Sequence, residues 1–426
     1  MTTYRERELA RRAAGRGPGS RRLLGLTAQT YAIQTQPGLE GVAFAEVAAH
    51  FAPASAGAIA APRRRDGVRE LGRRSVPGRV GMTLFHAAPL EPLLTLRASE
   101  DLFAVVAYSN DLAIDRRALE RIRALARDAP YVESALAARV KVLPRARSGR
   151  RLKFRIVARM TGLQEFRRSE FKQAIERGIS ERGDRSWRCV AEDADVEFWA
   201  TLLDDELIFA LRLSDETMRQ RDYKTAHIAG SLRPAVAAAM GLLSEPQPDD
   251  IVLDPFCGAG TILIERAHLE RYKALIGGDF DENALNAART NIGPRYKPIE
   301  LHTWDGAAIP LPDRAVSRII TNLPWGQQHG SHADNRRLYP RLLTEFARLV
   351  RDGGVIVILT GETRLMSELT RNGPLRAEKI VRVAILGAPA AIYVCRKRAT
   401  SLTKRTGHRA FEARIQGTAG VADQEF

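Results

Sequence analysis

Four short stretches in the last 40% of the chain carry side chains that can bind a ligand or take part in chemistry. They read D-P-F-C-G-A-G-T from Asp254, G-G-D-F-D from Gly277, W-D-G from Trp304 and N-L-P-W-G from Asn322. Each follows a short apolar run that is typical of a buried strand. Because ligands bind at the carboxyl ends of the strands in an open parallel sheet, we expect the four stretches to form one site.

The first stretch predicts a loop that holds a carboxylate rather than a phosphate. Gly258 and Gly260 let the backbone approach a ligand closely, and the loop leads into a helix N-terminus, which favours negative charge. No Gly-Lys-Ser/Thr follows, so the loop is not a P-loop. Leu263 stands where a dinucleotide-binding fingerprint has its third glycine, which argues against that motif as well.

The next two stretches supply groups that suit a nucleoside. Asp279, 25 residues beyond Asp254, could accept both hydroxyls of a ribose, and Phe280 could lie against an adenine. Asp305 could accept from the adenine amino group. Any one of these aspartates could instead cap a helix, but three at successive strand ends are hard to assign to caps alone.

A methionine carboxylate, a ribose and an adenine together describe S-adenosylmethionine, which is the predicted cofactor. The predicted cofactor-binding residues are Asp254, Phe256, Cys257, Gly258, Ala259, Gly260, Thr261, Asp279, Phe280, Asp305 and Gly306.

The fourth stretch is suited to hold the exocyclic amine of a nucleobase. Such an amine is a poor nucleophile, because its lone pair is delocalised into the ring. The side-chain oxygen of Asn322 and the carbonyl of Leu323 would accept hydrogen bonds from the amine and so push electron density back onto its nitrogen. Positive charge develops on this nitrogen during the transfer. Trp325 would stack on a base withdrawn from its pairing, and Pro324 would stiffen the turn. The alternative is a turn that merely closes a buried strand.

The elements that must position these stretches alternate between strands and helices, which predicts a doubly wound α/β fold. Strands are expected at 250–256, 274–280, 298–304, 317–323 and 353–360, with helices from Thr261, from Glu282 and near 337–350. An antiparallel hairpin is expected over 378–398.

The first half of the chain predicts two α+β units between basic tails. The tails cover 1–27 and 398–426, the units 28–110 and 111–214, and a linker with a helix covers 215–247. Residues 53–78 are expected to be loop-rich and 89–98 helical. Residues 151–160 predict a strand with one apolar and one basic face, and 169–181 an amphipathic helix.

Charge points to a polyanionic partner, since the chain has a formal net charge of +16. Residues 137–190 hold sixteen basic and five acidic residues, whereas 251–395 hold eighteen and fifteen, so the charge gathers outside the candidate site. The three cysteines are far apart and lack metal spacing, so we expect no zinc site and a cytoplasmic location. No apolar run approaches the length of a membrane span.

The motifs D-P-F-C-G-A-G-T, G-G-D-F-D and N-L-P-W-G, in this order, resemble the class I S-adenosylmethionine-dependent methyltransferases that act on base amines. More narrowly, the chain resembles the THUMP-domain RNA methyltransferases, in particular the tRNA guanine-N2 methyltransferases. The stretches QTQPGLEGV, FRIVARMTGLQEFRRSEF and RQRDYKTAHIAGSLRPAVAAAM agree, and the resemblance covers about residues 28–397.

This resemblance implies a ferredoxin-like domain at 28–110 and a THUMP domain at 111–214 that grips the tRNA acceptor arm. It implies a Rossmann-like methyltransferase domain at 248–397, with a mostly parallel seven-stranded sheet that ends in an antiparallel hairpin. The catalytic residues implied are Asn322, Leu323, Pro324 and Trp325, with Arg233 and Pro234 bordering the cofactor, no metal, and a monomeric protein. Leu323 and Trp325 depart from the family pattern, which has a second proline and then Tyr or Phe.

The predicted activity is methylation of guanine N2 in tRNA, at position 6 in first place and position 10 next. A 23S rRNA guanine-N2 or a DNA adenine-N6 methyltransferase is the alternative, because guanine and adenine both carry an exocyclic amine. A binding protein that no longer catalyses would show a broken cofactor edge, whereas Asp254, Gly258, Gly260, Asp279 and Asn322 are all present. No dedicated base is evident.

Overall fold

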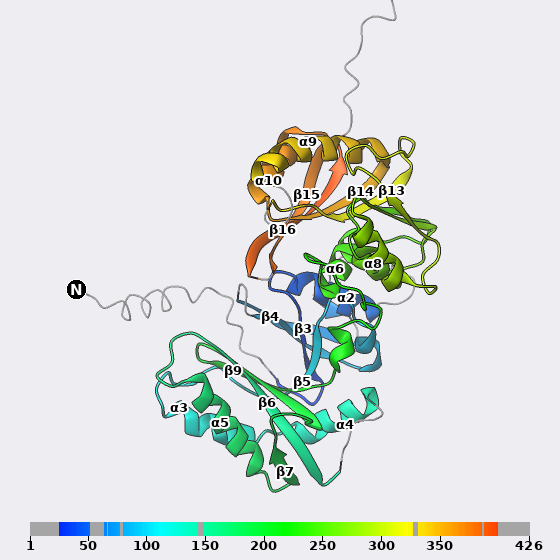
Figure 1. The fold of residues 1–426 in the computed structure, drawn as a ribbon. Helices are drawn as coiled ribbons and strands as arrows, with labels where there is room; N and C mark the ends of the chain where they lie inside the picture. The colour runs from blue at the N-terminus through cyan, green and yellow to red at the C-terminus, as the bar shows by residue number, and fades with distance from the viewer. Residues whose placement is uncertain are drawn as a thin grey trace, which may run out of the picture.

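The computed structural model of the protein describes residues 25–51, 64–65, 67–76, 80–143, 149–326, 331–385 and 387–398. The predicted basic tails lie outside the described residues, except for 25–27 and 398. The described chain forms two sheets with helices packed on them, the seven-stranded sheet in the upper part of Figure 1 and the nine-stranded sheet below it. No helix in this part of the chain is both long and apolar enough to cross a bilayer.

The nine-stranded sheet has the strand order β2-β3-β4-β1-β5-β9-β8-β6-β7. Its strands are β1 (Thr30–Gln34), β2 (Arg64–Arg65), β3 (Val68–Val76), β4 (Val80–Ala87), β5 (Asp101–Ser109), β6 (Arg151–Thr161), β7 (Ser186–Cys189), β8 (Val196–Leu203) and β9 (Glu206–Arg212). The two α+β units predicted for 28–110 and 111–214 share this sheet, because β5 pairs with β9. The boundary between them stays a prediction.

Helices pack on this sheet with their apolar stripes inward. They are α2 (Glu40–His50), α3 (Ala118–Arg127), α4 (Val132–Val142) and α5 (Arg168–Ser180), with 3-10 turns η1 (Glu91–Thr95) and η2 (Glu216–Met218). The stripe predicted for α5 is buried, as Phe171, Ile175 and Ile179 show. On β6, Phe154 and Ile156 are buried while Arg155 between them is exposed, so this strand has the predicted apolar and basic faces.

The seven-stranded sheet has the order β12-β11-β10-β13-β14-β16-β15. Its strands are β10 (Ile251–Asp254), β11 (Ala274–Asp279), β12 (Ile299–Thr303), β13 (Val316–Asn322), β14 (Val350–Thr360), β15 (Leu375–Ile385) and β16 (Ala388–Lys397). The first five are parallel, whereas β15 and β16 form the predicted antiparallel hairpin. The chain runs outward from β10 to β12 and returns on the other side of β10 at β13. Ligands bind at such a switch point, beyond the carboxyl ends of the strands.

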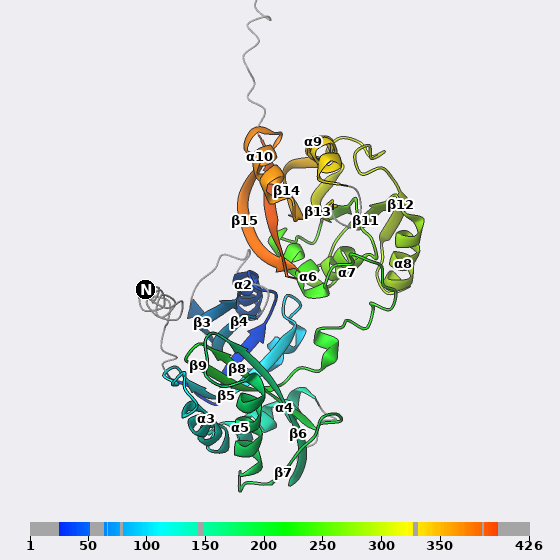
Figure 2. The ribbon, with the colours of Figure 1, turned by 60° about the vertical axis from the view of Figure 1, so that its left-hand side comes forward.

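Five helices accompany this sheet: α6 (Pro234–Leu243), α7 (Thr261–Leu269), α8 (Glu282–Ile292), α9 (His332–Leu349) and α10 (Thr363–Asn372). Figure 2 shows α6 and α7 at the junction of the two sheets, beside α2 and to its right. Proline at the start of α6 fits this position, because the first N–H of a helix has no intrahelical partner.

One buried carboxylate joins the two halves of the molecule. Glu265, on α7, accepts hydrogen bonds from Arg97 Nε at 2.6 Å and from the Tyr223 hydroxyl at 2.7 Å. Arg221 Nε adds a third contact at 3.3 Å. Arg97 precedes β5 of the nine-stranded sheet, while Arg221 and Tyr223 belong to the linker. A single side chain therefore holds the first sheet and the linker against the helix that follows the glycine loop.

Three expectations for secondary structure were wrong. Residues 53–78 were expected to be loop-rich, but Val68–Val76 form β3. Few of its side chains are buried, so its strand structure depends on backbone pairing with β4 rather than on apolar alternation. The helix expected over 89–98 is only the short turn η1. Helix α9 begins at His332 rather than near 337, because Ser331 and Asp334 form a capping box.

Candidate active site

The predicted site residues lie at the carboxyl ends of four neighbouring strands of the seven-stranded sheet. Asp254 ends β10, Asp279 ends β11, Asn322 ends β13, and Asp305 follows β12 by two residues. Parallel pairing of β10 with both β11 and β13 brings these ends to one edge. The tertiary structure therefore assembles stretches that are up to 71 residues apart in sequence.

The glycine loop is held against the second strand end. The carboxylate of Asp279 accepts the Gly258 N–H at 3.0 Å through Oδ2 and the Asp281 N–H at 3.1 Å through Oδ1. Gly258 and Gly260 have φ of 51° and 76°, values that disfavour other residues. A Cβ at Gly260 would also lie 3.3 Å from the Ala288 Cβ. The loop therefore needs both glycines for its conformation.

The rest of the loop is largely buried. Cys257, Ala259 and Thr261 are buried, and the Cys257 N–H donates to the Gly278 carbonyl at 2.9 Å. The ring of Phe256 lies against Gly306, where a Cβ would come within 2.6 Å of it. Side chains of the loop thus fix its own position and that of the turn after β12.

Asp254 is a fully buried acid at the base of the loop. Its Oδ1 accepts the Phe256 N–H at 3.2 Å, but its Oδ2 has no hydrogen-bond partner among the described residues. Burial, reinforced by the charge of Asp279, raises the pKa of Asp254 to about 7. The side chain therefore binds a proton over much of the acid range, and its Oδ2 is buried away from solvent.

This raised pKa predicts a pH-dependent cost to stability. An unfolded aspartate ionises near pH ~4, so between about pH 4 and 7 the native state binds more protons, and the free energy of unfolding falls as pH rises. Asp254→Asn keeps the acceptor for Phe256 and removes the ionisation. Without cofactor, it should match the wild type near pH 4 and exceed it at pH 8 by roughly 1–3 kcal/mol.

Thermal unfolding at both pH values measures this difference. The control is Asp249→Asn, at an exposed aspartate near the start of β10, which should track the wild type throughout. An equal gap between Asp254→Asn and the wild type at the two pH values would contradict the role of ionisation.

The residues predicted to meet a nucleoside are open to solvent. Phe280 is 74% exposed, an unusual state for a large aromatic side chain. The Asp305 carboxylate accepts the Ala307 N–H at 2.9 Å and lies 3.6 Å from Arg341. Both side chains are therefore accessible at the strand edge, as a ligand-binding role requires.

The fourth strand end forms a tightly held turn. Leu323 is buried and donates its N–H to the Leu359 carbonyl at 3.0 Å. The Pro324 carbonyl accepts from the Tyr339 hydroxyl at 2.7 Å and from Asn335 Nδ2 at 3.1 Å. Two side chains of α9 therefore lock the middle of the turn, which leaves its flanking groups to meet a substrate.

Asn322 and Trp325 contact each other across this turn. The indole Nε1 of Trp325 donates to the Asn322 Oδ1 at 3.1 Å. An amide oxygen has two acceptor positions, so this oxygen keeps one for another donor. The Trp325 ring packs on Gly361, where a Cβ would lie 2.8 Å from it. The departure from the usual Tyr or Phe thus supplies a donor that holds the Asn322 amide.

Sequence reasoning missed Asn291, which fastens the linker to the glycine loop. Its Oδ1 accepts the N–H groups of Thr225 at 3.0 Å and Ala226 at 2.8 Å. Its Nδ2 donates to the carbonyls of Ala226 and Ala259, both at 3.0 Å. Asn291 lies near the end of α8, and only its burial, which the sequence does not reveal, distinguishes it from a surface asparagine.

Two residues carried over from the family resemblance lie at the start of α6. Arg233 is the N-cap and Pro234 the first residue of the helix. The Arg233 Nη1 donates to Glu100 Oε1 at 3.1 Å, which ties α6 to the nine-stranded sheet. A role for these residues beside a cofactor stays a prediction.

Known proteins resemble this chain in sequence and in fold. Residues 221–389 match the family model described as RMKL-like, methyltransferase domain. A mouse protein named tRNA (guanine(6)-N(2))-methyltransferase THUMP3 is 33% identical over 229 residues, which span 50% of this chain and 45% of that protein. A Thermus thermophilus protein named tRNA (guanine(6)-N2)-methyltransferase is 29% identical over 54% of this chain and 68% of its own length.

The likeness to solved structures extends over most of the chain. The crystal structure of TrmN from Thermus thermophilus has a TM-score of 0.67 and 22% identity, and the match covers 87% of this chain and 99% of that one. The predicted fold class, a Rossmann-like methyltransferase sheet preceded by α+β units, is thereby confirmed. By contrast, the chain spans about half the length of the mammalian THUMP3 relatives that it matches.

Proposed function

We propose that this chain transfers a methyl group from S-adenosylmethionine to the exocyclic N2 of a guanosine in tRNA, at position 6 in first place and position 10 next. The observation that carries the proposal is the single edge formed by the Asp254 loop, Asp279 and the Asn322–Trp325 turn. The names of the mouse and Thermus thermophilus relatives support guanine N2 of tRNA as the acceptor.

The residues at this edge fit the proposed cofactor. The glycine loop suits the methionine part, and the unpartnered oxygen of buried Asp254 suits a cationic amino group. Asp279 would hold the ribose, exposed Phe280 the adenine face and Asp305 the adenine amine. When bound, S-adenosylmethionine supplies an electrophilic methyl group. The chain's own task is to place an amine in line with it.

Asn322 and Leu323 would activate the amine by accepting its hydrogens. The second acceptor position of the Asn322 oxygen and the Leu323 carbonyl would both point to the nitrogen on which positive charge develops, so they stabilise the transition state more than the ground state. Trp325 would stack on the base and at the same time fix the Asn322 amide. The hydrogen bonds from Tyr339 and Asn335 would keep the turn in position throughout.

The hydrogen bond between the indole and the amide gives a separate prediction. Trp325→Phe keeps an aromatic face but removes the N–H donor, so turnover should fall roughly 5- to 10-fold while cofactor affinity is retained. Trp325→Ala, which also removes the stacking face, should be slower still. Steady-state methylation with each variant measures the difference, and a Phe variant as active as the wild type would show that the bond does not orient Asn322.

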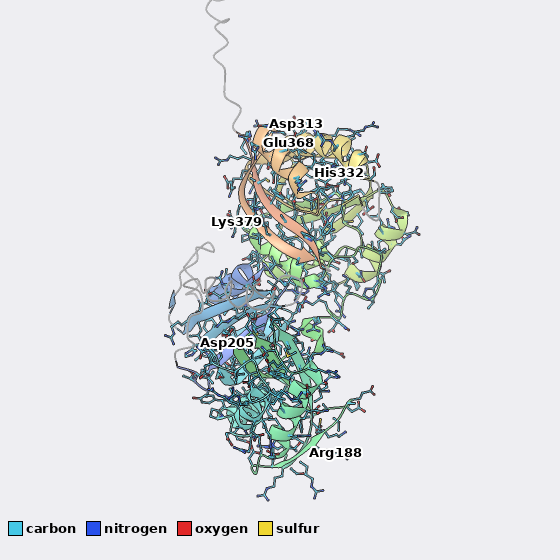
Figure 3. The ribbon with its side chains drawn as sticks, turned by 90° about the vertical axis from the view of Figure 1, so that its left-hand side faces the viewer. Arg188, Asp205, Asp313, His332, Glu368 and Lys379 are labelled. Carbon is cyan, nitrogen blue, oxygen red and sulfur yellow. The ribbon has the colours of Figure 1, made fainter. Side chains whose placement is uncertain are left out.

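The nine-stranded sheet is the proposed tRNA-binding part, with the acceptor-arm region as its target. Much of its charge is used internally, since Arg155 pairs with Glu197 and Arg182 with Asp184. In the described part of the chain, no carboxylate pairs with Arg151 or with Arg188. Figure 3 shows Arg188 at the far end of this sheet. Such free arginines suit contacts to phosphates, which position an RNA without reading its sequence.

The test is one incubation of the purified protein with isotope-labelled S-adenosylmethionine and unmodified bulk tRNA. Digestion to nucleosides should give label in N2-methylguanosine, and fragment mapping then separates position 6 from position 10. Label in a methyladenosine would contradict the assignment of guanine as the methylated base. No label on tRNA would contradict the assignment of tRNA as the substrate. The same assay would then be carried out with 23S rRNA and with DNA.

A further inference from the structure

A concave site lies beside the turn that carries Asn322 and Trp325. It is a pocket of about 560 Å³, lined by His332 and Arg336 of α9, by Glu362, Thr363 and Arg364 at the start of α10, and by Glu368 in the middle of that helix. Its volume falls within the range of roughly 300–1,000 Å³ found for ligand pockets. Of these residues, Figure 3 labels His332 and Glu368.

The pocket is continuous with the turn. Gly361, which follows β14, also lines the pocket, and its backbone lies directly under the Trp325 ring. Asn335 Nδ2 bridges the Pro324 carbonyl at 3.1 Å and Glu362 Oε1 at 3.2 Å. A chain of contacts therefore runs from the proposed base-binding turn to the pocket wall, so the same molecule can fill both.

One of the two acids in the pocket is already engaged. Glu362 is largely buried, and its Oε2 lies 2.7 Å from His332 Nδ1. Its Oε1 is taken by Asn335, as described above. Both oxygens of Glu362 therefore already have partners within the protein.

The two arginines of the pocket, by contrast, are free. Arg336 and Arg364 are exposed, and neither forms an ion pair or a side-chain hydrogen bond with any residue that the structure describes. Arg364 lies in the first turn of α10, where backbone N–H groups lack intrahelical acceptors and the helix dipole favours an anion. Two unpaired guanidinium groups and a helix N-terminus thus surround one concavity, an arrangement that suits a phosphate.

We propose that this pocket binds the sugar-phosphate backbone of a nucleotide adjacent to the target guanosine. The inference rests on the proposed function, since it assumes that a base reaches the Trp325 turn. A base that leaves its stack remains attached to its neighbours, so a phosphate of the flanking strand must lie close to that turn. Arg336 and Arg364 receive it, and Glu368, the remaining acid of the pocket, opposes it.

The test compares RNA kinetics of arginine variants with matched controls on the same helices. Arg336→Ala and Arg364→Ala should each lower kcat/KM for the RNA roughly 3- to 10-fold, mainly through KM, and reduce the salt dependence of RNA binding. Arg337→Ala on α9 and Arg371→Ala on α10 remove exposed arginines outside the pocket and should match the wild type. Glu368→Gln should act in the opposite direction and lower KM.

The outcomes separate this inference from the proposed function. If the wild type methylates RNA and the pocket variants have the KM and salt dependence of the controls, the pocket does not bind the strand and the inference is overturned. A wild type that methylates no RNA overturns the proposed function itself. Because all five positions are exposed, lost folding is not expected, and unchanged binding of S-adenosylmethionine by each variant verifies this.

Discussion

Asn322→Ala is expected to lower kcat for RNA methylation about 100- to 1,000-fold, the usual cost of losing one group aimed at developing charge. The affinities for S-adenosylmethionine and for tRNA should stay close to those of the wild type. Asn322 lies at the end of β13, on the outer side of a turn whose backbone is held by Tyr339 and Asn335. Its removal therefore leaves the turn in place and takes away the acceptor.

Single-turnover methylation with saturating cofactor measures this effect directly. Asn322→Asp keeps an oxygen for both the Trp325 N–H and the base amine, so it should recover a large part of the lost rate. Asn372→Ala, at an exposed asparagine that ends α10, is the matched control and should leave kcat unchanged. Methylation by Asn322→Ala at the wild-type rate would refute the role of this side chain.

Glu265→Ala is expected to cause the largest loss of stability, a fall of roughly 5–10 °C in Tm. The Glu265 side chain is fully buried, and those of Arg97 and Arg221 are only 17% and 8% exposed. Without the carboxylate, two guanidinium groups and the Tyr223 hydroxyl would be left poorly solvated and unpaired, which costs about 3 kcal/mol or more. The loss of stability would be concentrated at the junction between the two sheets.

Calorimetry of the wild type and the variant tests this expectation. Glu120→Ala removes a glutamate that is 72% exposed and pairs with Arg123 on α3, so its Tm should stay within about 2 °C of the wild type. Because the lost contacts join two sheets, Glu265→Ala should also broaden the transition or divide it in two. A Tm equal to that of the Glu120 control would show that other contacts hold the junction.

The sequence by itself determined the fold of the second half of the chain. Its β-branched runs, separated by helical segments, predicted strands β10 to β14 and the hairpin of β15 and β16 along the chain. Apolar runs of this kind are buried on both sides wherever a parallel sheet forms. The strand ends followed from the same pattern, so Asp254, Asp279 and Asn322 could be named as neighbours in advance. Local signals sufficed here because each element carries its own period and its own cap, as Asp281 does for α8.

Pairing between distant segments was decided only by the tertiary structure. The sequence VRELGRRSV has no apolar alternation that would predict a strand. It forms β3 because its backbone pairs with that of β4. The two N-terminal units share one sheet because β5 finds β9, about 100 residues later. Hydrogen bonding across a sheet depends on which segments meet, and a single stretch of sequence does not carry that information.

The candidate site shows the same contrast between what the sequence predicts and what the tertiary structure decides. The residue types at the strand ends predict what they could bind, whereas the side chains that hold them in position come from elsewhere in the chain. Asn291 fastens the linker, Tyr339 and Asn335 lock the Pro324 carbonyl, and Glu265 joins the two halves. Each is a common polar residue on a helix. It acquires its role only through burial beside a particular partner, because a polar group removed from water must find a hydrogen bond within the protein.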